Sequence, residues 1–411
     1  METEHSKLKI SDNHKNCSYC NKPFTEELWC KECDPYRIIE GWTSGNSVID
    51  KFIKDTMYNA RNNGYEFLEC VPFDRFTDIK EIGEGGFAKV YSATWIDGKS
   101  RYNKSDDGSW KKIELGSMKV ALKRLNGSQN ISDKYLNELK INWKISNKSG
   151  LKFYGLTKYP ETKEFMMIMQ FADKGSLRSS LSNNFNNTMW ENKIYHLFLI
   201  LYDLNSLHKL GYCHKDFHTG NILQIDIGSP CVSDFGLSGP ANEPKSDDNV
   251  IYGVMPYIAP EALNGDSYTS SSDIYSVGVI MAELSSGRPP FYNNKHDLNL
   301  SLAICNGLRP EFGKGTPEFY KKLAYKCMNA NPNERPTAEE LMDIFDFWND
   351  SINGKKDEIE KFGYKGKEIK AAFKEANKEI PNISTSYEKN SDAVYTNTDD
   401  ENKVDNEVNL I

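Results

Sequence analysis

A glycine-rich segment is the first part of this sequence whose residue types and spacing suggest chemistry. Residues 83–90 read GEGGFAKV and separate two stretches rich in β-branched and aromatic residues, which predicts a turn between two strands. Glycine has no side chain, so the backbone N–H groups of such a turn can approach nucleotide phosphates closely. Glycine-rich hairpins that bind no ligand are comparably common, and this segment alone does not distinguish the two readings.

A lysine and a glutamate follow on the next two predicted elements. In the strand-like run VALK, Ala121 and Lys123 point to the same face, where a small residue leaves room for a flat base and a lysine can reach phosphates. The next run, SDKYLNELKINWKI, predicts a helix capped by Ser132, and its Glu138 could pair with Lys123. Taken alone, Lys123 or Glu138 is explained equally well as an exposed surface residue.

Two cysteine pairs near the N-terminus form a separate pattern. Cys17 and Cys20 make one CxxC turn, and Cys30 and Cys33 make a second one nine residues later. Each turn can present two thiolates to one tetrahedral Zn²⁺, and metal binding would supply the folding energy of a module too small for its own core. The alternative is a thiol-rich leader without a fixed structure.

The elements that must position these residues divide the chain into six parts. Residues 73–348 show the strand-rich beginning and helix-rich remainder of one large α+β unit, with long apolar helices predicted at Asn192–His208 and Asp273–Leu284. The other expected parts are a disordered leader (1–16), the cysteine module (17–40), a linker helix (41–72), a charged and exposed helical extension (349–388) and a disordered acidic tail (389–411).

Composition excludes several classes of protein. The 51 basic and 59 acidic residues leave a net charge of −8, which argues against nucleic-acid binding. No apolar run is long enough for a membrane helix, and the N-terminus lacks the apolar core of a signal peptide. We therefore expect an intracellular protein, cytoplasmic with the nucleus left open, whose cysteines are thiols or metal ligands.

Taken in order, the motifs resemble those of eukaryotic protein kinases. The glycine-rich loop, VALK and Glu138 are followed by MIMQFADKGSL, then HKDFHTGN at 214–221, then Asp-Phe-Gly at 234–236 and Ala-Pro-Glu at 259–261. Within that family the sequence looks most like the tyrosine-kinase-like group of Ser/Thr kinases, and like expanded fungal kinases with an N-terminal cysteine-pair module. The resemblance implies a bilobal fold, with a small β-rich lobe carrying one helix and a larger helical lobe.

The resemblance also implies the catalytic machinery. Asp216 would accept the proton of the substrate hydroxyl, and Asn221 and Asp234 would hold Mg²⁺. Lys123, held by Glu138, would orient the phosphates of ATP. His214 and Phe235 would pack the loop, Asp273 would anchor it, and Glu261 would pair with Arg335. The residues expected to bind ATP are Ile82, Gly83, Glu84, Gly85, Gly86, Phe87, Val90, Ala121, Lys123, Met169, Gln170, Phe171 and Ala172.

Five positions depart from the family pattern. Ala88 replaces a glycine, Lys215 replaces the arginine that grips a phosphate on the activation segment, and Asn142 replaces an apolar residue. His218 and Val254 stand where Ser/Thr kinases keep a lysine and a threonine that contact each other. Lysine offers a point charge instead of a bidentate fork, and the segment 237–258 is short, so we expect activity to depend only weakly on phosphorylation there.

The sequence supports one leading function and three alternatives. The leading one is a protein kinase that uses Mg²⁺-ATP to phosphorylate Ser/Thr hydroxyls of protein substrates in intracellular signalling. The alternatives are tyrosine or dual specificity, a nucleotide-binding scaffold, and a small-molecule kinase, which would lack the Ala-Pro-Glu segment. The cysteine module, with structural Zn²⁺, and the C-terminal helices are candidates for binding partner proteins.

Overall fold

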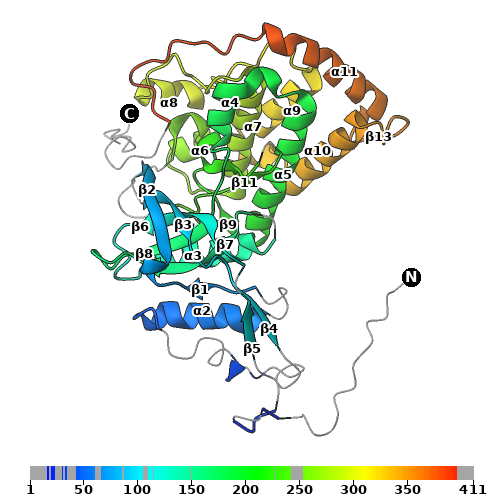
Figure 1. Ribbon diagram of the computed structural model, residues 1–411. Coiled ribbons are helices and arrows are strands. Elements are labelled where there is room, and N and C mark those ends of the chain that lie inside the picture. The colour runs from blue at the N-terminus through cyan, green and yellow to red at the C-terminus, as the bar shows by residue number, and fades with distance from the viewer. Residues whose placement is uncertain are drawn as a thin grey trace. The chain divides into compact units, whose positions relative to one another are not determined.

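The computed structural model forms two compact units. It describes residues 16–17, 20–23, 30, 33–34, 43–60, 66–85, 88–104, 110–113, 115–148, 150–226, 228–241 and 253–395. The sheet unit comprises 1–83, 89–132 and 153–170, and the helical unit comprises 84–88, 133–152 and 171–411. The predicted division into a β-rich lobe and a larger helical lobe is confirmed, and Figure 1 labels the strands and helices of both units. The one helix expected in the small lobe is grouped with the helical unit instead.

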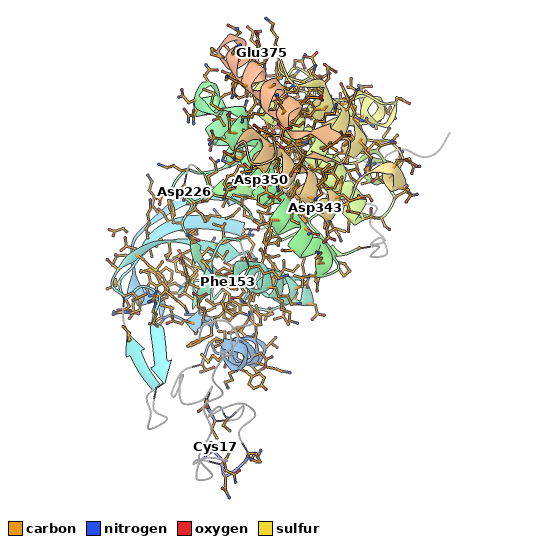
Figure 2. All side chains as sticks on the ribbon, turned by 90° about the vertical axis from the view of Figure 1, so that its right-hand side faces the viewer. Cys17, Phe153, Asp226, Asp343, Asp350 and Glu375 are labelled. Atoms are coloured by element: carbon orange, nitrogen blue, oxygen red, sulfur yellow. The ribbon has the colours of Figure 1, made fainter. Side chains whose placement is uncertain are left out.

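The sheet unit is built on six strands in the order β1-β7-β8-β6-β3-β2. The alternation predicted for the VALK strand is present, because Val120 and Leu122 are fully buried in the core of this unit. Figure 2 shows Phe153 among the side chains that fill this sheet. The strands are β1 (Glu69–Cys70), β2 (Phe76–Gly85), β3 (Ala88–Trp95), β6 (Met118–Leu125), β7 (Phe153–Lys158) and β8 (Phe165–Gln170).

The predicted linker helix belongs to the sheet unit. Helix α2 (Ser47–Asn59) is capped by Asn46, whose side chain accepts hydrogen bonds from two backbone N–H groups of the first turn. Its inward stripe of Ile49, Ile53 and Met57 is buried. The chain then returns to add β1 beside β7 in parallel, and β4 (Arg101–Lys104) and β5 (Trp110–Ile113) form a separate antiparallel pair.

The helical unit is organised around two buried helices. Helix α7 (Ser270–Ser286) is apolar on nearly all sides and almost wholly buried, as its sequence predicted, and a capping box at Thr269 and a left-handed Gly287 define its ends. Helix α5 (Trp190–Lys209) contacts both α7 and α10. The other helices are α3 (Asp133–Ser146), α4 (Leu177–Asn184), α6 (Pro260–Leu263), α8 (Leu298–Cys305), α9 (Glu318–Cys327), α10 (Ala338–Ile352) and α11 (Gly366–Glu379).

Short strand pairs complete this unit and shape its loops. The strands β10 (Ile222–Gln224) and β11 (Pro230–Val232) form one antiparallel pair. The strands β9 (Tyr212–Cys213) and β12 (Gly239–Pro240) form a second, and β13 (Glu360–Lys361) and β14 (Tyr364–Lys365) form a third. The first two pairs flank the segment 214–221, so they set the positions of the residues predicted to be catalytic.

The charged extension is less exposed than its sequence suggested. Helix α11 buries Ile369, Phe373 and Ala376, and the ring of Phe373 lies 5.4 Å from that of Trp190 on α5. The expectation of an exposed extension is therefore wrong for this face of α11. Its charged residues lie on the outside, as Glu375 does in Figure 2, because the helix is amphipathic and covers the core with one side.

The first residues of the predicted acidic tail are also packed. Ala393 and Tyr395 are buried, and Tyr395 donates a hydrogen bond from its hydroxyl to the carbonyl of Pro290. The expectation of disorder from residue 389 onward is therefore wrong for residues 389–395, whose aromatic and apolar side chains find partners on the helical unit. The rest of that tail and residues 1–15 lie outside the described residues. In the parts of the chain that are described, no helix has the length and apolarity to cross a membrane.

Candidate active site

The buried helix α7 holds the segment 214–221 through hydrogen bonds to Asp273. The carboxylate of Asp273 accepts the backbone N–H groups of His214 at 2.8 Å and Lys215 at 3.0 Å. It also lies 2.9 Å from Nε2 of His208 on α5. Lys215 has a φ of 67°, a conformation that is unusual for a residue with a side chain, so this anchor holds the loop in a sharp turn. These contacts agree with the prediction that Asp273 anchors the loop.

His214 is a packing residue of this loop. Its ring is fully buried, lies 5.4 Å from the rings of both Phe217 and Phe235, and has Nε2 3.0 Å from the carbonyl of Ser233. Burial lowers the pKa of His214, although the nearby Asp273 opposes this shift. A neutral, enclosed imidazole suits the predicted role in packing better than a role in proton transfer.

Asp216 and Asn221 are joined directly. The side-chain amide of Asn221 donates to the backbone carbonyl of Asp216 at 3.0 Å and to its carboxylate at 2.9 Å. Asp216 is buried, which raises the pKa of its carboxyl, but its interaction with the neighbouring His218 outweighs burial and lowers that pKa overall. The carboxylate is therefore ionised at neutral pH and held in one orientation.

A strand pair brings Asp234 to the same place as Asn221. Asn221 directly precedes β10, and Asp234 follows two residues after β11 ends, so the antiparallel pairing closes a gap of thirteen residues. The Ser233 N–H donates to the Asn221 carbonyl at 2.8 Å. Asp234 has a φ of 61°, and its carboxylate accepts the Gly236 N–H at 3.3 Å. Asn221 and Asp234, which carry the amide and carboxylate oxygens that Mg²⁺ prefers, thus lie at the same end of this strand pair.

Glu138 lies beside this acidic edge. It is buried on α3, and a Cβ atom added to Gly236 would lie 3.6 Å from its carboxylate and 3.3 Å from that of Asp234. Asn142, the polar departure one turn later, donates to the backbone carbonyl of Glu138 at 3.0 Å, so its amide is satisfied inside the helix. Pairing of Glu138 with Lys123 stays a prediction, because the two residues belong to different units.

The residues predicted to bind the base and phosphates are divided between the two units. Ala121 and Lys123 on β6 are half-buried on the face opposite Val120, and Ala121 is paired directly with Met169 on β8. The structure places Ile82, Gly83, Glu84 and Gly85 at the end of β2, Val90 on β3, and Gln170 at the end of β8. Phe171 and Ala172 begin the helical unit, and Gly86 and Phe87 lie outside the described residues.

A buried ion pair holds the segment after the active site. Arg335 donates to both oxygens of Glu261, each at 2.7 Å, and also to the carbonyls of Ser271 and Asn329. The guanidinium lies over the ring of Tyr275. The predicted pairing of these two residues, 74 positions apart, is confirmed, and it has the bidentate geometry that an arginine alone can provide.

Sequence reasoning missed a polar cluster next to His218. Arg178 on α4 lies 3.2 Å from the Tyr257 hydroxyl and 3.9 Å from the carboxylate of Glu283 on α7. Glu283 also accepts from Thr219 at 2.9 Å. Burial raises the pKa of Glu283, and Arg178 and the two hydroxyl donors oppose that shift. The sequence could have indicated Glu283, because it is a glutamate in an otherwise apolar helix. No pattern around Arg178 in the sequence indicates its role.

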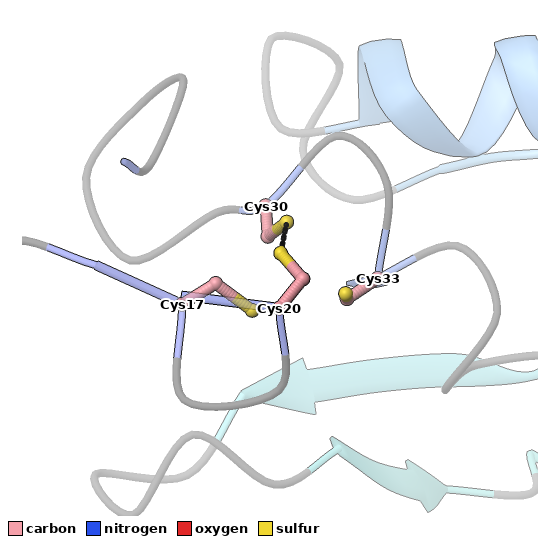
Figure 3. Close-up of side chains that lie close together, drawn as sticks. All are labelled: Cys17, Cys20, Cys30 and Cys33. Atoms are coloured by element: carbon pink, nitrogen blue, oxygen red, sulfur yellow. Dashed lines mark hydrogen bonds between the residues drawn. The ribbon is translucent and has the colours of Figure 1, made fainter. Parts of the chain in front are cut away.

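The four N-terminal cysteines converge on one point. Their sulfur atoms all lie within 4.8 Å of one another, and the sulfurs of Cys20 and Cys30 are 3.6 Å apart (Figure 3). The first turn closes through the N–H of Asn21, which adopts φ 55° and donates to the Cys17 carbonyl. Burial and hydrogen bonds from the other three thiols raise the pKa of Cys33 to about 12. The arrangement is that of a four-sulfur cation site.

Several known proteins to which this chain is similar are described as protein kinases. A family model described as protein tyrosine and serine/threonine kinase matches residues 76–345. Two probable serine/threonine-protein kinases of Dictyostelium discoideum are 29% and 27% identical, each over 64% of this chain but only 14% and 15% of their own length. Serine/threonine-protein kinase 4 homolog A of that organism is 28% identical over 65% of this chain and 54% of its own length. The chain thus spans about half of that relative, and far less of the other two.

Proposed function

The chain belongs to the protein tyrosine and serine/threonine kinase family, and we propose that it transfers the γ-phosphoryl of Mg²⁺-ATP to Ser/Thr hydroxyls of protein substrates. One observation carries the proposal. Asp216 and Asn221 belong to one loop that Asp273 anchors, and the β10–β11 pair brings the segment of Asp234 beside this loop. Phosphoryl transfer needs this kind of positioned charge more than it needs covalent chemistry.

Asp216 is the group that positions the acceptor hydroxyl. Its ionised carboxylate can accept the hydroxyl proton, and the hydrogen bond from Asn221 fixes its direction. The amide nitrogen of Asn221 is engaged by Asp216, so the amide oxygen is the atom that suits a cation. With the Asp234 carboxylate nearby, these oxygens fit Mg²⁺, which when bound neutralises charge on the phosphates.

We assign ATP recognition to the residues of the sheet unit and the start of the helical unit. The half-buried Ala121 beside Met169 offers a small, apolar surface for the adenine, and Lys123 on the same face of β6 can reach the phosphates. Gln170, Phe171 and Ala172 supply backbone groups for the base, and the glycine-rich segment 83–87 supplies N–H groups for the phosphates. Glu138 holds Lys123 in this proposal.

Two observations favour Ser/Thr over tyrosine as the acceptor. The relatives compared above are named serine/threonine-protein kinases, and the residues that follow Asp216, 217–221, lack the arginine that tyrosine kinases carry in this loop. The second candidate is a nucleotide-binding scaffold that only docks partners. The complete set of Lys123, Glu138, Asp216, Asn221 and Asp234 favours the enzyme, because a scaffold has no need of all five.

We assign a structural Zn²⁺ to the cysteine cluster. Zinc–sulfur bonds of about 2.3 Å in a tetrahedron put neighbouring sulfurs roughly 3.8 Å apart. The separation of 3.6 Å between the Cys20 and Cys30 sulfurs fits this geometry and is far too long for a disulfide. The metal would fold a small module for binding partner proteins, within a cytoplasmic signalling enzyme.

The test compares autophosphorylation and peptide phosphorylation by the wild type, Asp216→Asn and Asp343→Asn. Asparagine keeps the size of Asp216 and removes its charge, whereas Asp343 is an exposed residue of α10 and serves as the matched control. We expect Asp216→Asn to lower kcat by about 10²–10⁴-fold and Asp343→Asn to leave it unchanged. Equal phosphate incorporation by wild type and Asp216→Asn would overturn the assignment. Phosphoamino-acid analysis of the product distinguishes Ser/Thr from tyrosine.

A further inference from the structure

His218 occupies a position between the proposed base and the polar cluster. Its Nε2 lies 3.5 Å from Oδ1 of Asp216, and its Nδ1 lies 3.4 Å from the guanidinium of Arg178. We propose that His218 is a neutral positioning residue for Asp216, and that the segment Asn390–Tyr395, here called the C-terminal strap, keeps it in place through Arg178. The proposal rests on the kinase function proposed above and adds a positioning residue to that active site.

Hydrogen-bond donors determine which nitrogen of His218 carries the proton. The Gly220 N–H donates to Nδ1 at 3.0 Å, and the Arg178 guanidinium, which has donors only, approaches the same nitrogen. Nδ1 must therefore be the acceptor, and the proton of a neutral imidazole lies on Nε2. That N–H faces the carboxylate of Asp216, so the ring donates toward the proposed base without carrying a charge.

The carboxylate of Asp216 is thus approached by donors on both of its oxygens. Asn221 donates to Oδ2 at 2.9 Å, and His218 presents Nε2 to Oδ1. The separation of 3.5 Å is long for a hydrogen bond, as is common in catalytic groups before substrate binds. A planar ring held at Nδ1 by Gly220 and Arg178 keeps Nε2 directed at this carboxylate. A flexible lysine, which related Ser/Thr kinases have at this position, would provide charge but less rigidity.

Gly220 makes the room that this ring needs. A Cβ atom built on Gly220 would lie 2.7 Å from Cε1 and 2.8 Å from Nδ1 of His218, and 3.2 Å from the Arg178 guanidinium. Any side chain at position 220 would push the ring off its backbone donor. The ring of His218 can therefore occupy this position only because residue 220 is a glycine.

Arg178 receives a close contact from the C-terminal strap. The Tyr395 carbonyl accepts its guanidinium at 2.6 Å, compared with 3.2 Å to the Tyr257 hydroxyl and 3.9 Å to Glu283. The guanidinium also lies 5.1 Å from the centroid of the Tyr395 ring. Removing the strap would take away the shortest of these contacts and expose more of the half-buried Arg178 side chain.

The strap itself is held by the loop between α7 and α8. The Asn390 N–H donates to the Tyr292 carbonyl at 2.9 Å, and the His296 N–H donates to the Asp392 carbonyl at 3.2 Å. The ring of Tyr395 packs edge-on against that of His296, 4.8 Å away. In Figure 1 the chain after α11 runs back toward α8 to make these contacts. A segment about 180 residues after Asp216 therefore reaches its immediate surroundings.

The first test changes His218. His218→Gln can keep a donor near the position of Nε2, and His218→Leu removes the donor while keeping an apolar side chain. We expect His218→Leu to lower kcat by about tenfold or more, His218→Gln to recover most of it, and the KM for ATP to stay the same in both. Equal kcat values for the two variants would overturn the positioning role.

The second test removes the strap. A chain ended after Lys389 is compared with one ended after Asn397, which keeps the Tyr395 carbonyl as a peptide group and loses the same acidic residues from 399 onward. We expect the shorter chain alone to lose about tenfold in kcat, and the loss to disappear when both carry His218→Leu. A loss of the same size in both backgrounds, with equal melting temperatures, would show that the strap does not act through His218.

A third readout does not depend on activity. Long-range ¹H–¹⁵N spectra of the wild-type protein report the tautomer of each histidine, and His218→Gln identifies the signal. We expect Nε2 protonated in the wild type and in the chain ended after Asn397. The opposite tautomer would refute the inference even if phosphorylation is observed. Conversely, an inactive wild type with the expected tautomer would refute the proposed function alone.

Discussion

A buried lysine gives a prediction about stability that the structure makes quantitative. Lys193 on α5 is fully buried, and its ammonium nitrogen has no hydrogen-bond partner among the described residues. It lies 3.9 Å from the ring centroid of Phe185 and 5.0 Å from that of Trp190. Burial lowers the pKa of Lys193 from 10.5 to about 7. The change Lys193→Met keeps the length of the side chain and removes the amine.

The expected magnitude follows from the two pKa values. Their difference corresponds to about 5 kcal/mol of stability lost near pH 7, because the unfolded chain keeps a proton that the folded chain binds poorly. We therefore expect Lys193→Met to stabilise the helical unit on the order of 4–5 kcal/mol at pH 7.

The pH dependence gives the sharper check. The folded pKa lies below the unfolded one, so the wild type gains stability as the pH rises from about 7 to 10.5, and Lys193→Met does not show this gain. Urea unfolding of both proteins at pH 7, 8.5 and 10 measures the gap between them, and other titrating groups cancel in the difference. Lys209→Met, an exposed lysine near the end of the same helix, is the control. A gap that stays constant across this range would refute the reasoning.

Three further predictions concern the other sites. Arg335→Met should destabilise the helical unit by about 3–5 kcal/mol in urea unfolding, because it leaves the carboxylate of Glu261 without its bidentate partner; a loss below about 1 kcal/mol would contradict this. Native mass spectrometry should find one Zn²⁺ per chain in the wild type and less in Cys30→Ser, and equal metal content would exclude the four-cysteine site. Phosphatase treatment should leave most of the kinase activity, because Lys215 offers no bidentate grip on a phosphate; near-complete loss would show that activation follows the usual family pattern.

Local patterns in the sequence predicted the reaction class and most of the elements. HKDFHTGN, Asp-Phe-Gly and Ala-Pro-Glu are short motifs whose order is informative without any coordinates. The apolar runs at 192–208 and 273–284 predicted the buried helices α5 and α7, because burial on all sides requires apolar residues at every position. The partnership of Glu261 and Arg335 came from resemblance, and no local pattern would have revealed it.

The errors had a common origin in the C-terminal region. A high density of charge suggested exposure for 349–388 and disorder from 389, yet Phe373 and Tyr395 are both buried. A few large apolar side chains among many charges are enough to dock a segment when a complementary surface exists. That surface is made by residues from distant parts of the chain, so composition alone could not indicate it.

The sequence by itself determined which groups are available for phosphoryl transfer, because chemistry depends on residue type and on spacing within a loop. Only the tertiary structure decided how those groups are held. The β10–β11 pair joins Asn221 to Asp234, α7 supplies Asp273, and a strap about 180 residues downstream reaches His218 through Arg178. Such contacts depend on the packing of the whole helical unit, since their separation along the chain leaves no periodic or local signal.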